Sequence, residues 1–336
     1  MSYASNPGRT DNLLILRGLC SLGVLLVHCI TLFPLSFDFG LFYPNTGANF
    51  VIIFFVLSGY LMGKIFWMGK YSLNLESTLH FYRNRFLRIA PLLYFSTAAL
   101  IALNPGIVVG NVKQIIGDFL FINNFTGRIV NPVTWSISYE MQDYFLFPVI
   151  IYFFCSRDRN TFLACLGTIA ALLFLSFSTD TIVLKWTWVF LSGYLVNILI
   201  RHVHERYKVN GSKLKTITMF FVFLLANLFF YVIVNTTGNQ SIAYLQLVVV
   251  SMGVILVMEL PYDQKETTQG EVFTWLGRIS YGVYLWHFPL IIYFKDKITS
   301  FGMFTFTVLA LTLIVSTVTF YLIEAKYRPS LLPIHL

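Results

Sequence analysis

Apolar runs of about twenty residues follow one another along the whole chain, separated by short polar segments. A transmembrane helix needs roughly 20 mostly apolar residues, so the runs have the required length. They predict ten membrane spans, at residues 13–33, 48–68, 85–104, 134–155, 161–178, 182–200, 214–235, 241–259, 274–294 and 302–323. We therefore expect an all-α integral membrane protein, a bundle of about ten transmembrane helices in a single domain over residues 1–336.

The composition agrees with this prediction. Hydrophobic residues make up 57% of the chain and charged residues only 11%, with a mean hydropathy of +0.72. A soluble domain has about a quarter of its residues charged, so this chain is too apolar for that class. The first span is too long for a signal-peptide core and no small-residue cleavage site follows it, so we expect it to be retained.

The lysines and arginines predict the orientation in the bilayer, because cytoplasmic loops carry an excess of them. With the N-terminus inside, 18 of the 23 fall on the cytoplasmic side. The other side holds Lys113, Arg128, Lys185, Lys295 and Lys297. This asymmetry favours an even number of spans with both termini cytoplasmic. It also explains the net charge of +8, which therefore does not indicate a nucleic-acid partner.

Two ionisable residues, Arg17 and His28, lie inside the first span. Ionisable groups within a span are rare and costly, and they often mark a functional site. Eleven residues of helix bring both side chains to one face, about 16 Å apart along the axis. A snorkelling arginine and an unrelated packed histidine are the alternative, but the shared face favours a shared function.

Three further arginines, Arg83, Arg85 and Arg88, lead into span 85–104 from the cytoplasmic side. Arg85 and Arg88 are three residues apart and so are neighbours on one helix face. The guanidinium group stays charged and donates hydrogen bonds in pairs, which suits phosphate recognition. We expect these three and Arg17 to bind phosphate groups, with ordinary positive-inside charge as the alternative.

Toward the outer face, Glu140 lies near the start of one span and His287 near the end of another, at a depth similar to that of His28. An aromatic belt explains nearby tryptophans and tyrosines but not two imidazoles and a carboxylate. We predict that these three residues are catalytic. An imidazole can take a proton from an acceptor hydroxyl, and a carboxylate can orient the ring and stabilise its cation. A transient acyl-histidine is the alternative role for His28.

Arginines at the cytoplasmic mouth and acid–base groups farther out suit coenzyme A. Its phosphates would meet the arginines, and its pantetheine arm is comparable in reach to the distance from Arg17 to His28.

Ser58 is an alternative nucleophile, but packing of the small pair Ser58 and Gly59 is the favoured interpretation. The four cysteines lie in apolar spans without metal-ligand spacing, and no HExxH motif occurs, so we expect no metal site.

Five short motifs carry these residues along almost the whole chain. They are Leu16-Arg-Gly-Leu with Val27-His28, Phe54-Phe-Val-Leu-Ser-Gly59, Arg85-Phe-Leu-Arg-Ile-Ala-Pro91, Trp135-Ser-Ile-Ser-Tyr-Glu140 and Leu276-Gly-Arg-Ile-Ser-Tyr-Gly-Val-Tyr-Leu-Trp-His287. Each motif alone is weak. Together, in this order, they make the chain resemble the integral-membrane acyltransferase 3 family, which O-acylates bacterial surface polysaccharides and other extracytoplasmic acceptors.

The resemblance implies an acyl-CoA donor, most often acetyl-CoA, bound as a substrate and not as a permanent cofactor. It also implies ten core helices with cytoplasmic termini, and essential roles for Arg17, His28 and the arginines of the third span. Some relatives add an extracytoplasmic SGNH hydrolase-like domain; the chain ends at Leu336, so we expect none here.

The leading hypothesis is therefore a multi-pass O-acetyltransferase of the bacterial inner membrane, acting on a surface polysaccharide or its lipid-linked precursor, such as an O-antigen unit. One alternative keeps the enzyme but changes the acceptor to a small secreted molecule or a lipid headgroup. A non-enzymatic transporter or flippase is another. It is less favoured because many transporters are built from repeats and broken helices, which the sequence does not indicate.

Overall fold

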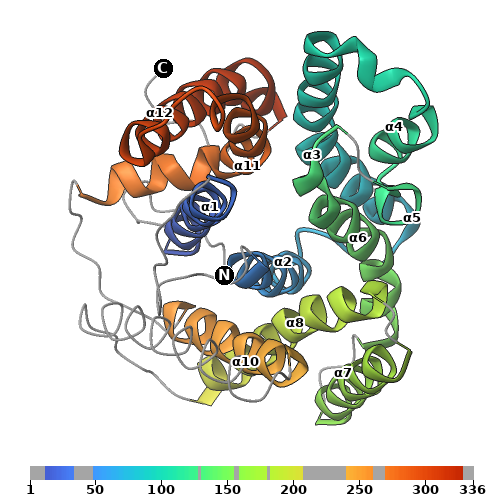
Figure 1. Cartoon of the computed structure of the whole chain (residues 1–336). Helices are drawn as coiled ribbons and strands as arrows, with labels where there is room; N and C mark the ends of the chain where they lie inside the picture. Colours follow the sequence, from blue (N-terminus) through green and yellow to red (C-terminus); the bar gives the residue numbers. More distant parts are fainter. Residues whose placement is uncertain are drawn as a thin grey trace. The chain divides into compact units, whose positions relative to one another are not determined.

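The computed structural model describes residues 12–33, 48–127, 130–154, 159–179, 182–206, 240–259 and 269–327. Within these ranges every regular element is helical (Figure 1). Four described helices are long and apolar enough to cross a bilayer: Asn12–Leu32, Phe50–Trp67, Leu75–Leu103 and Phe301–Tyr327. The protein is a helical membrane protein, while the count of ten spans and the cytoplasmic location of both termini stay predictions.

The long helices coincide with predicted spans. They are α1 (Asn12–Leu32), α2 (Ala48–Trp67), α3 (Leu75–Leu103), α6 (Trp135–Phe154), α7 (Arg159–Thr179), α8 (Ile182–Arg206), α10 (Gln240–Glu259), α11 (Gln269–Phe294) and α12 (Phe301–Thr319). The predicted span 214–235 lies outside the described residues.

Helix α3 differs from its prediction, because it begins at Leu75 and not at residue 85. The side chain of Asn74 accepts a hydrogen bond from the backbone N–H of Ser77 at 2.8 Å, which is the geometry of an N-cap. Glu76 places an acidic group in the first turn, where it complements the helix dipole. These polar residues start the helix ten residues before its apolar part, so a hydropathy criterion misses the true start.

Four short helices connect α3 to α6, and the sequence did not predict them. They are η2 (Pro105–Val108), α4 (Val112–Phe119), α5 (Asn123–Thr126) and η3 (Pro132–Thr134). Each has eight residues or fewer, which is too short for a clear apolar period.

The chain divides into two compact units. The described part of unit 1 comprises residues 12–33, 86–127, 130–135 and 269–327, and that of unit 2 comprises residues 48–85, 136–154, 159–179, 182–206 and 240–259. Helix α3 contributes to both, since the division falls between Arg85 and Phe86.

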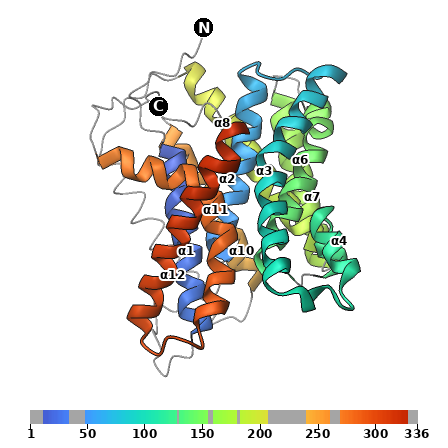
Figure 2. The same ribbon diagram turned by 90° about the horizontal axis from the view of Figure 1, so that it is seen from above.

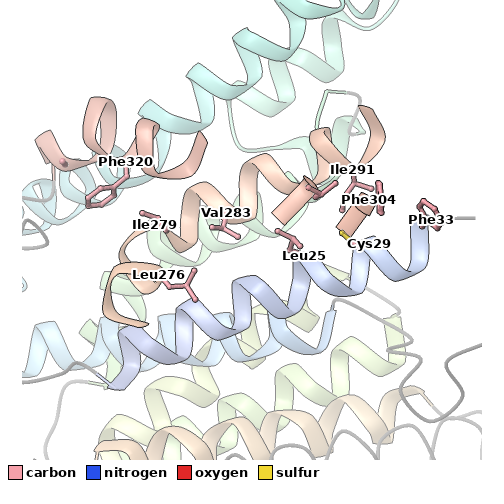
Figure 3. Close-up of a cluster of buried hydrophobic side chains, with 11 residues drawn as sticks. Leu25, Cys29, Phe33, Leu276, Ile279, Val283, Ile291, Phe304 and Phe320 are labelled. Atoms are coloured by element: carbon pink, nitrogen blue, oxygen red, sulfur yellow. The ribbon is translucent and has the colours of Figure 1, made fainter. Parts of the chain in front are cut away.

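In unit 1, α11 packs against both α1 and α12 (Figure 2). Their apolar faces form one buried cluster that includes Leu25, Val283, Ile291 and Phe304, all with no exposed surface (Figure 3). Helix α12 continues into a π-helical turn, η4 (Phe320–Glu324), and a short 3-10 turn, η5 (Ala325–Tyr327).

A glycine contact brings the backbones of α1 and α11 together. A Cβ atom added at Gly18 would lie 2.9 Å from the backbone nitrogen of Gly277, and one added at Gly277 would overlap the carbonyl group of Leu14. Small residues allow this close approach between membrane helices. The contact explains the glycine in each of the two corresponding motifs.

Unit 2 has the same kind of contact between α2 and α8. A Cβ atom at Gly59 would overlap the carbonyl oxygen of Phe190, and one at Gly193 would overlap that of Val56. Helices α7 and α10 also pack against α8. The packing interpretation of the second motif is therefore confirmed for Gly59.

Candidate active site

His28 of α1 and His287 of α11 form a hydrogen-bonded pair in unit 1. The Nδ1 atom of His28 lies 2.9 Å from the Nε2 atom of His287, and the two rings are nearly parallel, with an interplanar angle of 8°. His287 is completely buried, whereas His28 is half-buried. The ring of Phe288 meets His28 edge-on at 5.5 Å between centroids. Two residues that the sequence placed only at a similar depth are therefore in direct contact.

The hydrogen bonds also indicate which nitrogen atoms carry protons. The Nδ1 atom of His287 lies 3.0 Å from the carbonyl oxygen of Val283, and a carbonyl only accepts, so this nitrogen must carry hydrogen. In the neutral ring Nε2 is then an acceptor, and the Nδ1–H group of His28 donates to it. The lone pair of a neutral His28 is consequently on Nε2.

The contacts of α1 with α11 are in parallel register. The pairs Gly18–Gly277 and His28–His287 both differ by 259 in residue number. Both helices therefore run in the same direction from the glycine contact to the histidine pair, over ten residues, or about 15 Å. Arg17 is adjacent to the glycine contact and so lies at the end opposite His28, as the sequence predicted.

A loop residue that the sequence analysis missed, Asn131, is hydrogen-bonded to α11 close to His287. Pro289 has no N–H group, so it cannot bond the carbonyl oxygen of Leu285 four residues earlier in the helix. The side-chain nitrogen of Asn131 donates to this oxygen at 2.9 Å, and Asn131 is 1% exposed. One residue farther toward the N-terminus of α11, Tyr284 donates its hydroxyl to the carbonyl oxygen of Val133 at 2.9 Å. Helix η3 is thereby attached to α11.

Buried polar groups hold the same loop in place. The side-chain nitrogen of Asn123 donates to Asp118 at 2.8 Å and lies 2.9 Å from the hydroxyl of Thr134. The Thr134 hydroxyl also bonds the backbone oxygen of Asn131 at 2.8 Å. All four residues are at most 2% exposed. Such a network makes the position of the loop specific, because breaking any one bond strands a buried partner.

Glu140 of α6 belongs to unit 2, where it accepts two hydroxyl hydrogen bonds. One comes from Ser58 of α2 at 2.5 Å, and the other comes from Tyr144, one turn along α6. Ser58 is thus a hydrogen-bond partner of Glu140. The orienting role predicted for Glu140 is filled at Nδ1 of His28 by His287 in this structure.

The predicted phosphate-binding arginines differ in their surroundings. Arg83 is exposed and Arg88 is half-buried, whereas Arg85 is 8% exposed. The guanidinium carbon of Arg85 lies 5.7 Å from the ring centre of Phe81 and 5.8 Å from that of Tyr144.

Arg85, expected toward the cytoplasmic side, and Glu140, expected toward the outer face, both contact one residue of unit 2. Only Tyr144 separates them, since its ring meets Arg85 and its hydroxyl bonds Glu140. Helix α3 begins at Leu75, so Arg85 lies ten residues, or about 15 Å, along the helix from its start.

Unit 2 also holds Asp143, a buried acidic residue that the sequence analysis missed, whereas Glu140 is half-buried. Asp143 is 3% exposed, and one of its oxygens accepts the hydroxyl of Thr187 at 3.0 Å. The signal was available, since Asp143 follows Glu140 by three residues inside a predicted span. Asn131 had a signal too, because Pro289 inside a predicted span leaves a carbonyl group that needs a donor.

The cysteines Cys20, Cys29 and Cys165 are free and buried, and Cys155 lies outside the described residues. No group of three or more His, Cys, Asp or Glu side chains within the described ranges is arranged to hold a metal ion.

A helical membrane protein whose histidine pair begins eleven residues beyond Arg17 belongs to a class suited to moving a group between two substrates. The acyltransferase domain profile (acyltransferase 3) matches residues 11–325, and the chain belongs to this family. The resemblance to this family, which the five motifs indicated, is therefore confirmed.

Two relatives are informative. Peptidoglycan O-acetyltransferase OatA of Listeria monocytogenes is 25% identical over 291 residues, which are 72% of this chain and 44% of that protein. O-acetyltransferase OatA of Staphylococcus aureus is 22% identical over 276 residues, 71% of this chain and 45% of that protein. The chain thus spans about half the length of these curated relatives. No solved structure matches it significantly.

Proposed function

We propose that the protein is an O-acetyltransferase that moves the acetyl group of acetyl-CoA to a hydroxyl group of a cell-envelope polysaccharide. The observation that carries this proposal is the hydrogen-bonded pair of His28 and His287. It supplies a half-buried imidazole with a lone pair on Nε2 and a fixed partner on Nδ1. Membership of the acyltransferase family and the printed activities of the two relatives support it.

In the proposed reaction, Nε2 of His28 removes the proton of the acceptor hydroxyl as its oxygen attacks the thioester carbonyl carbon. The carbon–sulfur bond then breaks, and the coenzyme A thiolate takes that proton from Nε2. The products are the acetyl ester and free coenzyme A, so His28 ends as it began. His287 accepts the Nδ1–H bond throughout and stabilises the transient imidazolium, the task that a carboxylate performs in a hydrolase triad.

The acceptor is a polysaccharide met on the outer side of the bacterial inner membrane. The lipid-linked O-antigen unit is one such acceptor, and peptidoglycan is the other, since the Listeria relative is named for it. With both termini cytoplasmic, the arginine ends of α1 and α3 face the cytoplasm, where acetyl-CoA is found. The donor and the acceptor then enter from opposite faces.

The test uses the full chain in sealed, inside-out membrane vesicles supplied with acetyl-labelled acetyl-CoA. Label is expected on polysaccharide held in the lumen, and NMR of the host polysaccharide should lose its O-acetyl signals when the gene is deleted. Comparison of O-antigen with peptidoglycan fractions identifies the acceptor. Label only on cytoplasmic acceptors would overturn the two-sided arrangement, and no transfer from acetyl-CoA would overturn the proposed function.

A further inference from the structure

Two side-chain contacts in unit 1 join α3 to α11 and give the two helices a parallel register. The hydroxyl of Tyr281 donates to the carbonyl oxygen of Ile89 at 2.8 Å in a buried setting, and the rings of Phe95 and Trp286 meet at 6.4 Å. The residue numbers differ by 192 in the first pair and by 191 in the second. Both contacts lie within unit 1, and both helices run in the same direction between them.

This register places Arg278 beside the arginine motif of α3. Arg278 precedes Tyr281 by three residues, so the two share one face of α11, the face that meets α3. Subtracting 192 from 278 gives 86, which puts Arg278 at the level of the turn that contains Arg88. By the register of α1 with α11, Arg17 lies level with residue 276. Three parallel helices therefore each place an arginine at one level of unit 1.

The surroundings of Arg278 indicate an anion. Its Nε atom is buried and has no hydrogen-bond partner among the described residues. A buried donor of a charged group is costly unless it is bonded, and like charges gathered at one level repel one another unless an anion joins them. The histidine pair lies nine residues farther along α11, at about 14 Å.

We propose that Arg278, together with Arg88 and Arg17, binds the phosphate groups of the acyl donor. The ligand class is a nucleotide thioester with phosphates at one end and a reactive acyl group at the other. This inference rests on the proposed function, and it adds a binding residue from α11 to those predicted on α1 and α3. The distance along α11 from Arg278 to His287 then sets the separation between the phosphate groups and the acyl group of the bound donor.

The experiment measures binding of coenzyme A to the full-length protein in lipid nanodiscs. Arg278→Met should weaken coenzyme A at least tenfold, and Arg278→Lys should weaken it less, because lysine keeps the charge but loses the paired donors. Lys326→Gln, which removes an exposed cation of the same unit, is the matched control and should leave binding unchanged.

A truncated donor separates phosphate binding from a structural role. Acetylpantetheine has no nucleotide, so Arg278→Lys should raise the KM for acetyl-CoA while leaving the KM for acetylpantetheine unchanged. Equal effects on both donors, or unchanged coenzyme A binding in Arg278→Met, would overturn the role of Arg278. In that case loss of binding in Arg88→Met would leave the proposed function standing. Absence of coenzyme A binding in the unaltered protein would instead contradict the proposed function itself.

Discussion

The side-chain amide of Asn131 donates a 2.9 Å hydrogen bond to the carbonyl oxygen of Leu285, which Pro289 leaves without a partner in the helix. A loop and a helix far apart in the sequence are thus joined two residues from His287. In the Asn131→Ala variant, the Leu285 oxygen would be buried without a donor. That should cost about 1–3 kcal/mol of stability and lower the transfer rate by misplacing the histidine.

A second substitution tests this explanation. Pro289→Ala returns an N–H group to the helix, which can bond the Leu285 oxygen. The double variant should therefore recover most of the thermal stability and activity lost in Asn131→Ala. If the two losses simply add, the bond between Asn131 and Leu285 does not have the role assigned to it.

The histidine pair predicts a graded response to substitution. His28→Ala should reduce transfer at least 100-fold, because general base catalysis contributes roughly 10²–10⁴-fold, while the amount of inserted protein stays the same. Among His287 variants, Gln can still accept the Nδ1–H bond of His28, and Leu cannot. His287→Gln should therefore retain more activity than His287→Leu, measured as initial rates with labelled acetyl-CoA. More than about a tenth of normal activity in His28→Ala would exclude this residue as the base.

Substitution of Glu140 in unit 2 predicts a different kinetic change. Glu140→Gln keeps the shape but removes the charge that accepts bonds from Ser58 and Tyr144. It should lower kcat and leave coenzyme A binding unchanged, and Tyr144→Phe should do the same to a smaller extent. Tyr152→Phe, at an exposed position of the same helix, serves as the control. A change confined to KM for the donor would contradict this assignment.

The glycine contact of unit 2 predicts a stability effect. Gly59→Ala would push its methyl group into the Phe190 carbonyl and separate α2 from α8, so the melting temperature and the yield of folded protein should fall. Gly253 of α10 has open space around it. There the same substitution should be tolerated or raise stability by about 0.5–1 kcal/mol. Equal melting temperatures for the two variants would show that the contact is not tight.

The sequence predicts the positions of the long helices because bilayer thickness demands apolar runs, whatever the tertiary contacts. The start of α3 escapes this criterion, since Asn74 and Glu76 stabilise it by polar means. The sequence also places His28 and His287 at one depth but cannot predict their contact. That contact depends on the register of two helices 259 residues apart, which the fit of Gly18 against Gly277 determines. Arg278 was visible as a charge inside a span, yet its level beside Arg88 required the contact of Tyr281 with Ile89.

The separation of the arginine level from the histidine pair has a kinetic consequence. The phosphates of the donor are unchanged by acetyl transfer, so a site that holds them binds the product coenzyme A as well as it binds the substrate. Release of coenzyme A from the enzyme then becomes a slow step of the cycle, as product release is in many enzymes. Free coenzyme A should act as a competitive inhibitor at concentrations close to the KM for acetyl-CoA. The rate of surface acetylation would then follow the ratio of acetyl-CoA to coenzyme A in the cell.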